Sequence, residues 1–417
     1  MDQSSNPVVI VGAGLSGLAA AVTLRRADVP VVVLEASDVI GGRVRTDTVE
    51  STHGTYLIDR GFQVYLDAYP EGRRFFDHDD LRLGGFEPGA IVVTDGNRRR
   101  VADPRRRPTR SLETAVSGVA TVGDVIALAR LEDGLKSGAP FEQVERPTIE
   151  ALRDAGLSDR VIDRFFRPFF GGVFFDRDLR TSARMLAFTY GMFSSGRACL
   201  PDGGMGRLAS QLAAQLSADE LRVGVRVEGV DPAMVTVESG ETIEARAVIV
   251  ATDAGSASRL VPNAEPPIHD EWVATTMLAF DAPELDEPGH WLMLDGDGAG
   301  PVNHLAVPSA IQPCYAPVGR SLVYANTVGL PNASDDALEA AVRDQLGGWF
   351  PAGTGDWTLL RTLQIPNALP RAANWTVSPA PRRSGGIYIC GDHTHDPSIN
   401  GALASGRIAA EAVITDG

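Results

Sequence analysis

The stretch VVIVGAGLSG, residues 8–17, places a β-branched apolar run directly before a Gly-x-Gly-x-x-Gly motif. Such a run is typical of a parallel strand that is buried on both faces. The following segment, 18–27 (LAAAVTLRRA), predicts a helix, and 31–35 (VVVLE) predicts a second buried strand that ends at Glu35. This order of strand, glycine motif, helix and strand indicates a Rossmann-like α/β fold.

The glycine motif and the acid at the end of the second strand predict a dinucleotide site. Gly12 permits the tight turn, Gly14 lets backbone N–H groups approach a pyrophosphate, and Gly17 lets the helix pack against the strand. The helix N-terminus then faces the diphosphate. Glu35 can accept both ribose hydroxyls, which favours FAD or NAD over NADP. The residues expected to bind the cofactor here are Gly12, Ala13, Gly14, Leu15, Ser16, Gly17, Glu35 and Ala36.

The next segment, IGGRVRT at residues 40–46, resembles the GGR-x-x-T segment of the flavin amine oxidase and carotenoid desaturase superfamily. The resemblance implies FAD as the cofactor. Physical reasoning agrees, because Gly41 and Gly42 let the backbone approach a diphosphate. Arg43 adds a permanently charged donor fork for the same group.

The C-terminal stretch, residues 387–413, resembles the flavin segment of the same superfamily. There the acid after the glycine contacts ribityl or phosphate oxygens, and a helix begins beneath the flavin pyrimidine. A helix N-terminus at that place would stabilise negative charge on the reduced flavin. The resemblance implies contacts from Gly391, Asp392, Ile399, Asn400 and Gly401. His393 and His395 are candidate catalysts, although histidines in such a turn more commonly face solvent.

A meander of short strands is predicted over 221–250, and the resemblance places Val227 where a valine backbone meets the adenine. RGFQVYLDAYP at 60–70 looks like the corresponding segment of carotenoid desaturases and adds Gly61 and Phe62 to the expected cofactor site. FFGGVF at 169–174 and LPDGGMG at 200–206 also resemble that branch. Phe170 and Phe174, from the aromatic cluster 165–175, are candidate pocket residues, although such clusters form cores more commonly than pockets.

One position departs from the amine oxidases of the superfamily. These enzymes usually carry a lysine that bridges through water to flavin N5, and Thr275 occupies the matching place. The single lysine of the chain, Lys136, is far away in sequence. The departure weakens the amine oxidase interpretation without excluding it.

These segments predict an interleaved architecture. Residues 1–90, 200–260 and 385–417 would build a Rossmann-like FAD-binding domain. Residues 91–199, mostly helical, and 261–384, mostly strands with a helix near 334–347, would form an α+β substrate domain.

Composition restricts the partners. The chain has 417 residues and a net charge of −16, which argues against a nucleic acid partner. Its three cysteines lie far apart, so no disulfide framework or metal site is expected. Without a signal peptide pattern or an apolar run long enough to cross a membrane, a cytoplasmic location is expected. The arginine-rich stretch Arg98–Arg110 is a candidate for peripheral membrane contact, or else a solvated loop.

Together the patterns predict a flavoenzyme that binds FAD non-covalently and removes hydride from a C–H bond of a small, apolar substrate, with oxygen or a quinone as electron acceptor. No separate catalytic residue is assigned, because the flavin is the reagent. An amine or amino-acid oxidase of the same superfamily is the alternative enzyme. A flavin-free escort protein for prenylated partners is the alternative of another class.

Overall fold

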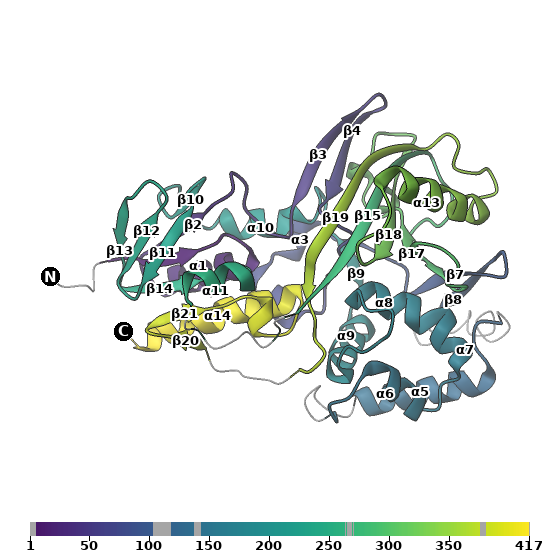
Figure 1. The fold of residues 1–417 in the computed structure, drawn as a ribbon, viewed down its shortest axis with the longest axis horizontal. Helices are drawn as coiled ribbons and strands as arrows, with labels where there is room; N and C mark the ends of the chain where they lie inside the picture. The colour runs from purple at the N-terminus through teal and green to yellow at the C-terminus, as the bar shows by residue number, and fades with distance from the viewer. Residues whose placement is uncertain are drawn as a thin grey trace.

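The computed structural model describes residues 6–102, 118–136, 143–262, 264, 269, 271–375 and 381–416. Figure 1 shows two lobes, one built around a parallel sheet and the other around a large antiparallel sheet with a helical layer. From residue 103 onward the predicted membrane contact Arg98–Arg110 lies outside the described residues. Within the described part of the chain, no helix is both long and apolar enough to cross a bilayer.

The first lobe contains a six-stranded sheet that brings distant parts of the chain together. Its order is β10 (Leu221–Val223), β2 (Val31–Glu35), β1 (Val8–Val11), β14 (Ala247–Val250), β21 (Ile387–Ile389) and β20 (Arg382–Ser384). All neighbours are parallel except the last pair. Val8, Val9 and Ile10 are completely buried, as expected for a strand covered on both faces.

Two helices pack side by side against one face of this sheet, α1 (Leu15–Arg26) and α14 (Ile399–Asp416). They approach closely because Gly406 lacks a side chain: a Cβ there would lie 2.0 Å from the Ser16 carbonyl oxygen. The other face meets the meander β11 (Val227–Asp231), β12 (Met234–Val237) and β13 (Thr242–Glu244), together with α11 (Ala254–Leu260). The helix α10 (Gly206–Ala213) contacts α1.

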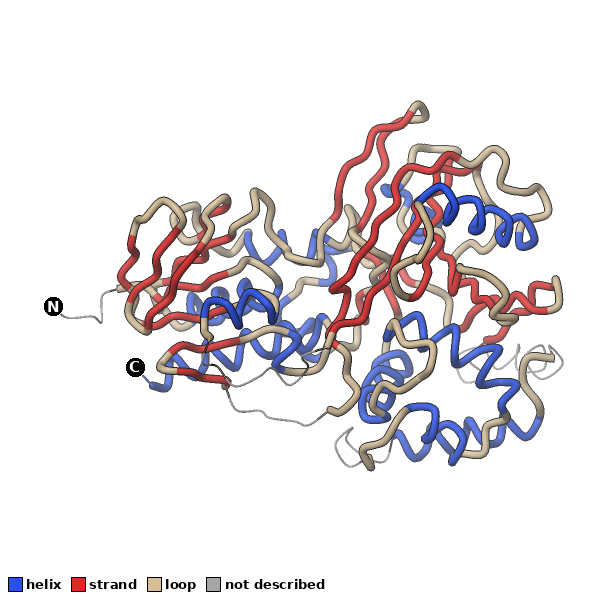
Figure 2. Tube along the Cα trace, viewed as in Figure 1, coloured by secondary structure: helices blue, strands red, loops and turns tan. Residues whose placement is uncertain are grey.

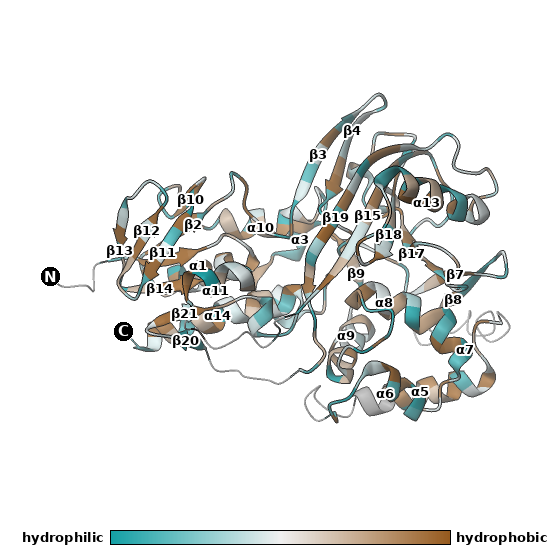
Figure 3. Cartoon of the chain, in the orientation of Figure 1, coloured by the Kyte–Doolittle hydropathy of each residue, from teal (hydrophilic) through white to brown (hydrophobic). Residues whose placement is uncertain are grey.

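The second lobe contains a seven-stranded sheet. Its order is β19 (Thr358–Pro370), β15 (Trp272–Pro283), β18 (Arg320–Val328), β17 (Val302–Ala306), β16 (Leu292–Asp295), β7 (Gly89–Thr94) and β8 (Asn97–Ala102). One face packs against α13 (Asp335–Trp349), whose Leu338, Val342 and Leu346 are buried. Figure 3 shows the alternation of hydrophobic and hydrophilic residues along these elements.

Helices gather on the other side of the second lobe (Figure 2). They are α5 (Val122–Lys136), α6 (Thr148–Asp154), α7 (Asp159–Val161), α8 (Arg167–Phe174) and α9 (Ala183–Ser195). Helix α8 contacts β16, β17 and β18, and therefore joins the helical layer to the sheet. The centre of this layer contains Phe165, Phe166, Phe169, Phe170 and Phe174.

Short elements connect the lobes. The hairpin of β3 (Thr46–Ser51) and β4 (Gly54–Asp59) projects from the molecule in Figure 1. A three-stranded sheet has the order β5 (Tyr65–Leu66), β9 (Ala198–Leu200) and β6 (Gly84–Gly85). Three further short α-helices are α2 (Pro70–Phe75), α3 (His78–Leu81) and α12 (Pro308–Ile311).

The observed fold is the mixed α/β architecture that the sequence predicts. One detail differs: Leu221–Val223 does not belong to the meander but extends the six-stranded sheet, because it pairs parallel with β2. The boundaries given for the two domains stay a prediction.

Candidate flavin and substrate site

A cavity of about 1510 Å³ runs from the carboxyl ends of β1, β2 and β14 to the second lobe. In open α/β sheets, ligands bind at the carboxyl ends of the strands where the strand order reverses. The volume of this cavity exceeds the roughly 300–1,000 Å³ typical of a site for one small ligand. The cavity is therefore large enough for a dinucleotide together with a substrate.

The glycine motif forms the wall at one end of the cavity. Gly12 has a positive φ of 107°, and a Cβ on Gly17 would lie only 2.0 Å from the Gly12 carbonyl oxygen. Gly14 is different, because a Cβ there would meet no atom within 4 Å. Gly12 thus permits the turn, and Gly17 permits the close packing of α1 against it. Gly14 borders open space through which a bound dinucleotide could pass.

Helix α1 presents an uncapped N-terminus to the cavity. Its N-cap residue is Gly14, no side chain caps it, and its first turn contains no acidic residue. The cavity-lining Leu15 and Ser16 follow directly. Free N–H groups and the positive end of a helix dipole form an anion site, which suits a diphosphate.

Glu35 lies at the end of β2 and is fixed by two backbone donors. Its carboxylate accepts hydrogen bonds from the N–H groups of Ala13 and Ser37, each at 2.8 Å. A carboxylate has about four lone-pair sites, so it can accept further donors. Ala36 and Val227 line the same end of the cavity, next to Glu35.

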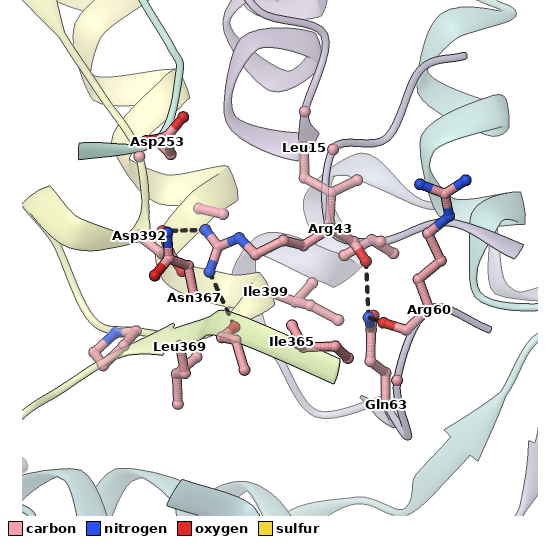
Figure 4. A pocket seen from close by; sticks show the side chains of 18 of the residues that line it. Leu15, Arg43, Arg60, Gln63, Asp253, Ile365, Asn367, Leu369, Asp392 and Ile399 are labelled. Atoms are coloured by element: carbon pink, nitrogen blue, oxygen red, sulfur yellow. Dashed lines mark hydrogen bonds and ion pairs between the residues drawn. The ribbon is translucent and has the colours of Figure 1, made fainter. Parts of the chain in front are cut away.

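Arg43 crosses the middle of the cavity (Figure 4). Its guanidinium donates to Asp392 Oδ1 at 2.6 Å and to the Ala368 carbonyl oxygen at 3.2 Å, and lies 5.1 Å from the ring centre of Trp272. The Asp392 charge raises the pKa of Arg43 above its ordinary value, although burial opposes the shift. Gln63 donates to the Arg43 carbonyl oxygen at 2.8 Å and so holds the backbone of the GGR segment.

The C-terminal segment supplies the opposite wall. Gly391, Asp392 and Ile399 line the cavity, and α14 begins there. Asn400 and Gly401 lie behind this wall. Asn400 accepts from the Glu71 N–H at 3.1 Å, and a Cβ on Gly401 would lie 1.9 Å from the Asp396 carbonyl oxygen. Their observed contacts position the start of α14.

The two histidines of this segment do not line the cavity. His393 is 2% exposed, and burial lowers its pKa to about 4. His395 Nδ1 lies 2.8 Å from Asp396 Oδ2. Neither is placed to act on a ligand in the cavity.

The end of the cavity in the second lobe is aromatic. Gly61 and Phe62 line it, as do Phe169, Val173, Phe174, Phe193, Leu363 and Ile365. Phe170 is not a lining residue: it is 2% exposed and stacks between Phe166 and Phe174. Of the two candidate pocket residues, only Phe174 reaches the cavity.

At the dinucleotide end, Ala13 and Gly17 do not line the cavity but lie behind its wall.

Thr275 lies on β15 and lines the cavity, but its side chain cannot take the role of the lysine found in amine oxidases. It is 2% exposed, and its hydroxyl donates to the Thr327 carbonyl oxygen at 2.7 Å. The hydroxyl is committed to the neighbouring strand, and a threonine carries no charge. The lysine–water arrangement of the amine oxidases therefore has no counterpart at this position.

His304 is a cavity residue that the sequence did not reveal. It lies on β17, is 4% exposed, and its ring centre is 5.3 Å from that of Phe62. Burial lowers its pKa to about 3, and the nearby Arg177 charge acts in the same direction. A single histidine within an apolar strand is no signal in a sequence, because core histidines have the same pattern.

The comparisons with known proteins agree with this geometry. The family described as flavin containing amine oxidoreductase matches residues 15–414. The chain belongs to this family. The family is one of flavin-containing oxidoreductases, and this membership favours an enzyme over the escort-protein alternative.

The chain is similar to several proteins and solved structures. An L-amino acid oxidase of Bothrops pictus is 58% identical over 163 residues, which are 38% of this chain and 30% of that protein. The match thus spans less than a third of that relative. An oxidoreductase structure from Methanosarcina mazei has a TM-score of 0.72 at 16% identity, covering 98% of this chain and all of that one. A putrescine oxidase structure has a TM-score of 0.67 at 18% identity, covering 98% and 99%. These two structures show a shared fold.

Proposed function

We propose that the protein binds FAD non-covalently and removes hydride from a C–H bond of a small hydrophobic substrate, passing the electrons to oxygen or a quinone. The aromatic lining at one end of the cavity carries this proposal. The flavin would accept the electrons, while the protein binds and orients the reactants and stabilises the charges that develop.

The residues present fit FAD. The open space beside Gly14 and the uncapped start of α1 suit the diphosphate, and the free acceptor capacity of Glu35 suits the ribose. Arg43 would add a charged donor, and Asp392 an acceptor for hydroxyl groups. The cysteine within the flavin segment, Cys390, is buried, so it offers no exposed thiol for a covalent link.

The substrate would occupy the cavity between Phe62 and Phe174. Burying apolar surface there stabilises binding by about 25 cal/mol per Å². The surrounding rings also exclude water from the place where hydride leaves. The start of α14 at Ile399 would stabilise negative charge on the reduced cofactor.

An amino-acid oxidase is the second candidate, and the match to the Bothrops pictus protein favours it. A carboxylate would need a cation near the substrate. Arg60 and Arg361 line the cavity, but the described structure pairs both with Asp47, at 3.0 Å each. Their charge is thereby partly neutralised, which ranks this function below the first.

Anaerobic mixing of the purified holoprotein with candidate donors tests the two functions. A hydrophobic polyene should bleach the flavin absorbance, and L-amino acids and simple amines should bleach it slowly or not at all. Bleaching by L-leucine without any response to hydrophobic donors would select the second function.

A further inference from the structure

The ring of His304 lines the aromatic end of the cavity, and its surroundings determine which of its two nitrogens carries the proton. The preceding residue in the chain, Asn303, sets this choice. Asn303 is 1% exposed and touches three partners. Its Oδ1 lies 3.2 Å from Arg177 Nε, and its Nδ2 lies 2.7 Å from the Pro168 carbonyl oxygen.

These two contacts fix the orientation of the Asn303 amide. A guanidinium only donates and a carbonyl oxygen only accepts, so the oxygen must face Arg177 and the nitrogen must face Pro168. The same Nδ2 lies 3.1 Å from His304 Nδ1. Because Nδ2 is a donor, His304 Nδ1 must accept.

A histidine that accepts at Nδ1 and stays neutral carries its proton on Nε2. The depressed pKa of His304, about 3, keeps the ring neutral at physiological pH. The charged groups that bear on the ring include Arg177, which disfavours a second proton. Among the described residues, no protein atom accepts a hydrogen bond from Nε2.

The ring is also held in place from both sides. A Cβ on Gly172 would lie 2.7 Å from His304 Nδ1, so the glycine lets helix α8 close over the Nδ1 edge of the ring. Phe62 packs against the ring face. Both of these neighbours line the cavity with His304.

We propose that His304 presents its Nε2–H to the substrate end of the cavity, as the donor for an uncharged oxygen acceptor on an otherwise apolar substrate. The assignment deepens the proposed function and rests on it. The substrate class becomes a hydrophobic molecule with a carbonyl, ether or hydroxyl oxygen, and His304 becomes its specificity-determining residue. Asn303 and Arg177 are positioning residues, because they act on the substrate only through the ring.

A matched set of ligands tests this assignment: farnesal, farnesol and farnesene, which differ in whether the isoprenoid carries an oxygen. Binding to the holoprotein is measured by anaerobic equilibrium dialysis. One hydrogen bond should make the aldehyde and the alcohol bind about three- to tenfold more tightly than the hydrocarbon.

Variants then assign the preference to the ring. His304→Leu should remove the preference, and His304→Gln should restore part of it, because an amide can accept from Asn303 and still donate to the ligand. His290→Phe, which replaces an exposed histidine, should leave it unchanged. Absorbance of bound flavin confirms that each variant is folded.

Nitrogen-15 NMR of the histidine rings gives a second readout that needs no ligand. The wild type should show His304 neutral with Nδ1 unprotonated, and Asn303→Leu should disturb that state. Equal binding of the three ligands, a preference that survives in His304→Leu, or a proton on Nδ1 would each overturn the assignment. Failure of all three ligands to bind would overturn the proposed function and this assignment with it.

Discussion

The Arg43 guanidinium and the Asp392 carboxylate, 349 residues apart in the chain, lie 2.6 Å from each other in the cavity. One comes from the segment after the first βαβ unit and the other from the segment before the last helix. Their contact joins the two ends of the chain at the place where the flavin is expected (Figure 4).

The Arg43 pair leads to a prediction about cofactor affinity. Arg43→Gln removes a charged donor, and charge-assisted hydrogen bonds contribute roughly 1.5–3 kcal/mol. We expect FAD to bind about ten- to a hundredfold more weakly, as measured by fluorescence titration of the apoprotein. Arg160→Gln is the control, because Arg160 is exposed on α7. This control variant should bind FAD as tightly as the wild type. Equal affinity of both variants would remove Arg43 from the cofactor site.

Glu35→Ala should also weaken FAD binding by about ten- to a hundredfold, for the same energetic reason. The side chain additionally accepts from the N–H groups of Ala13 and Ser37, so the melting temperature should be followed beside the affinity. A lower melting temperature with unchanged FAD affinity would make Glu35 a purely structural residue of the strand end.

The glycine motif offers a pair of variants with opposite expectations. Gly14→Ala adds a methyl group to open space at an ordinary φ of −72°, so the apoprotein should keep its melting temperature while FAD affinity falls. Gly17→Ala drives a methyl group into the Gly12 carbonyl oxygen, so the fold itself should suffer. Circular dichroism melts and FAD titrations of both variants separate the two effects. Full FAD affinity in Gly14→Ala would show that no ligand passes there.

The neutral state of His304 predicts a pH dependence of stability. Its folded pKa of about 3 lies below the ordinary 6.5, so between these values the unfolded chain binds a proton that the folded chain does not. The stabilisation is present above pH 6.5 and is lost as the pH falls towards 3. Urea unfolding at pH 7 and pH 5 measures how much the free energy of unfolding falls between these pH values. The fall should be roughly 2 kcal/mol smaller for His304→Leu than for the wild type. Parallel losses would mean that His304 titrates normally.

The sequence predicts the first strand, helix and second strand well, because their signals are contiguous. Residues 8–35 contain strand, turn, helix and acid in one run, and each is dictated by local backbone needs. The contact of Arg43 with Asp392 could not be predicted in the same way, since it depends on the packing of segments far apart. The resemblance to a known superfamily supplied both residues, but not their pairing.

The substrate side is less predictable. Phe170 and Phe174 are both phenylalanines and lie one turn apart on α8, yet only Phe174 lines the cavity. Phe170 is covered because it stacks between Phe166 and Phe174. His304 was missed for a related reason: its role depends on Asn303 and Arg177, which adjoin it only in the folded chain.

We propose that the flavin of this protein takes hydride from a hydrophobic donor. The most direct measurement is the rate of anaerobic flavin bleaching in a stopped-flow instrument, with phytoene and farnesol against putrescine and L-leucine. We expect at least one isoprenoid to bleach the flavin, and putrescine and L-leucine to be slow or inert. Rapid bleaching by putrescine or L-leucine, with no response to either isoprenoid, would contradict it.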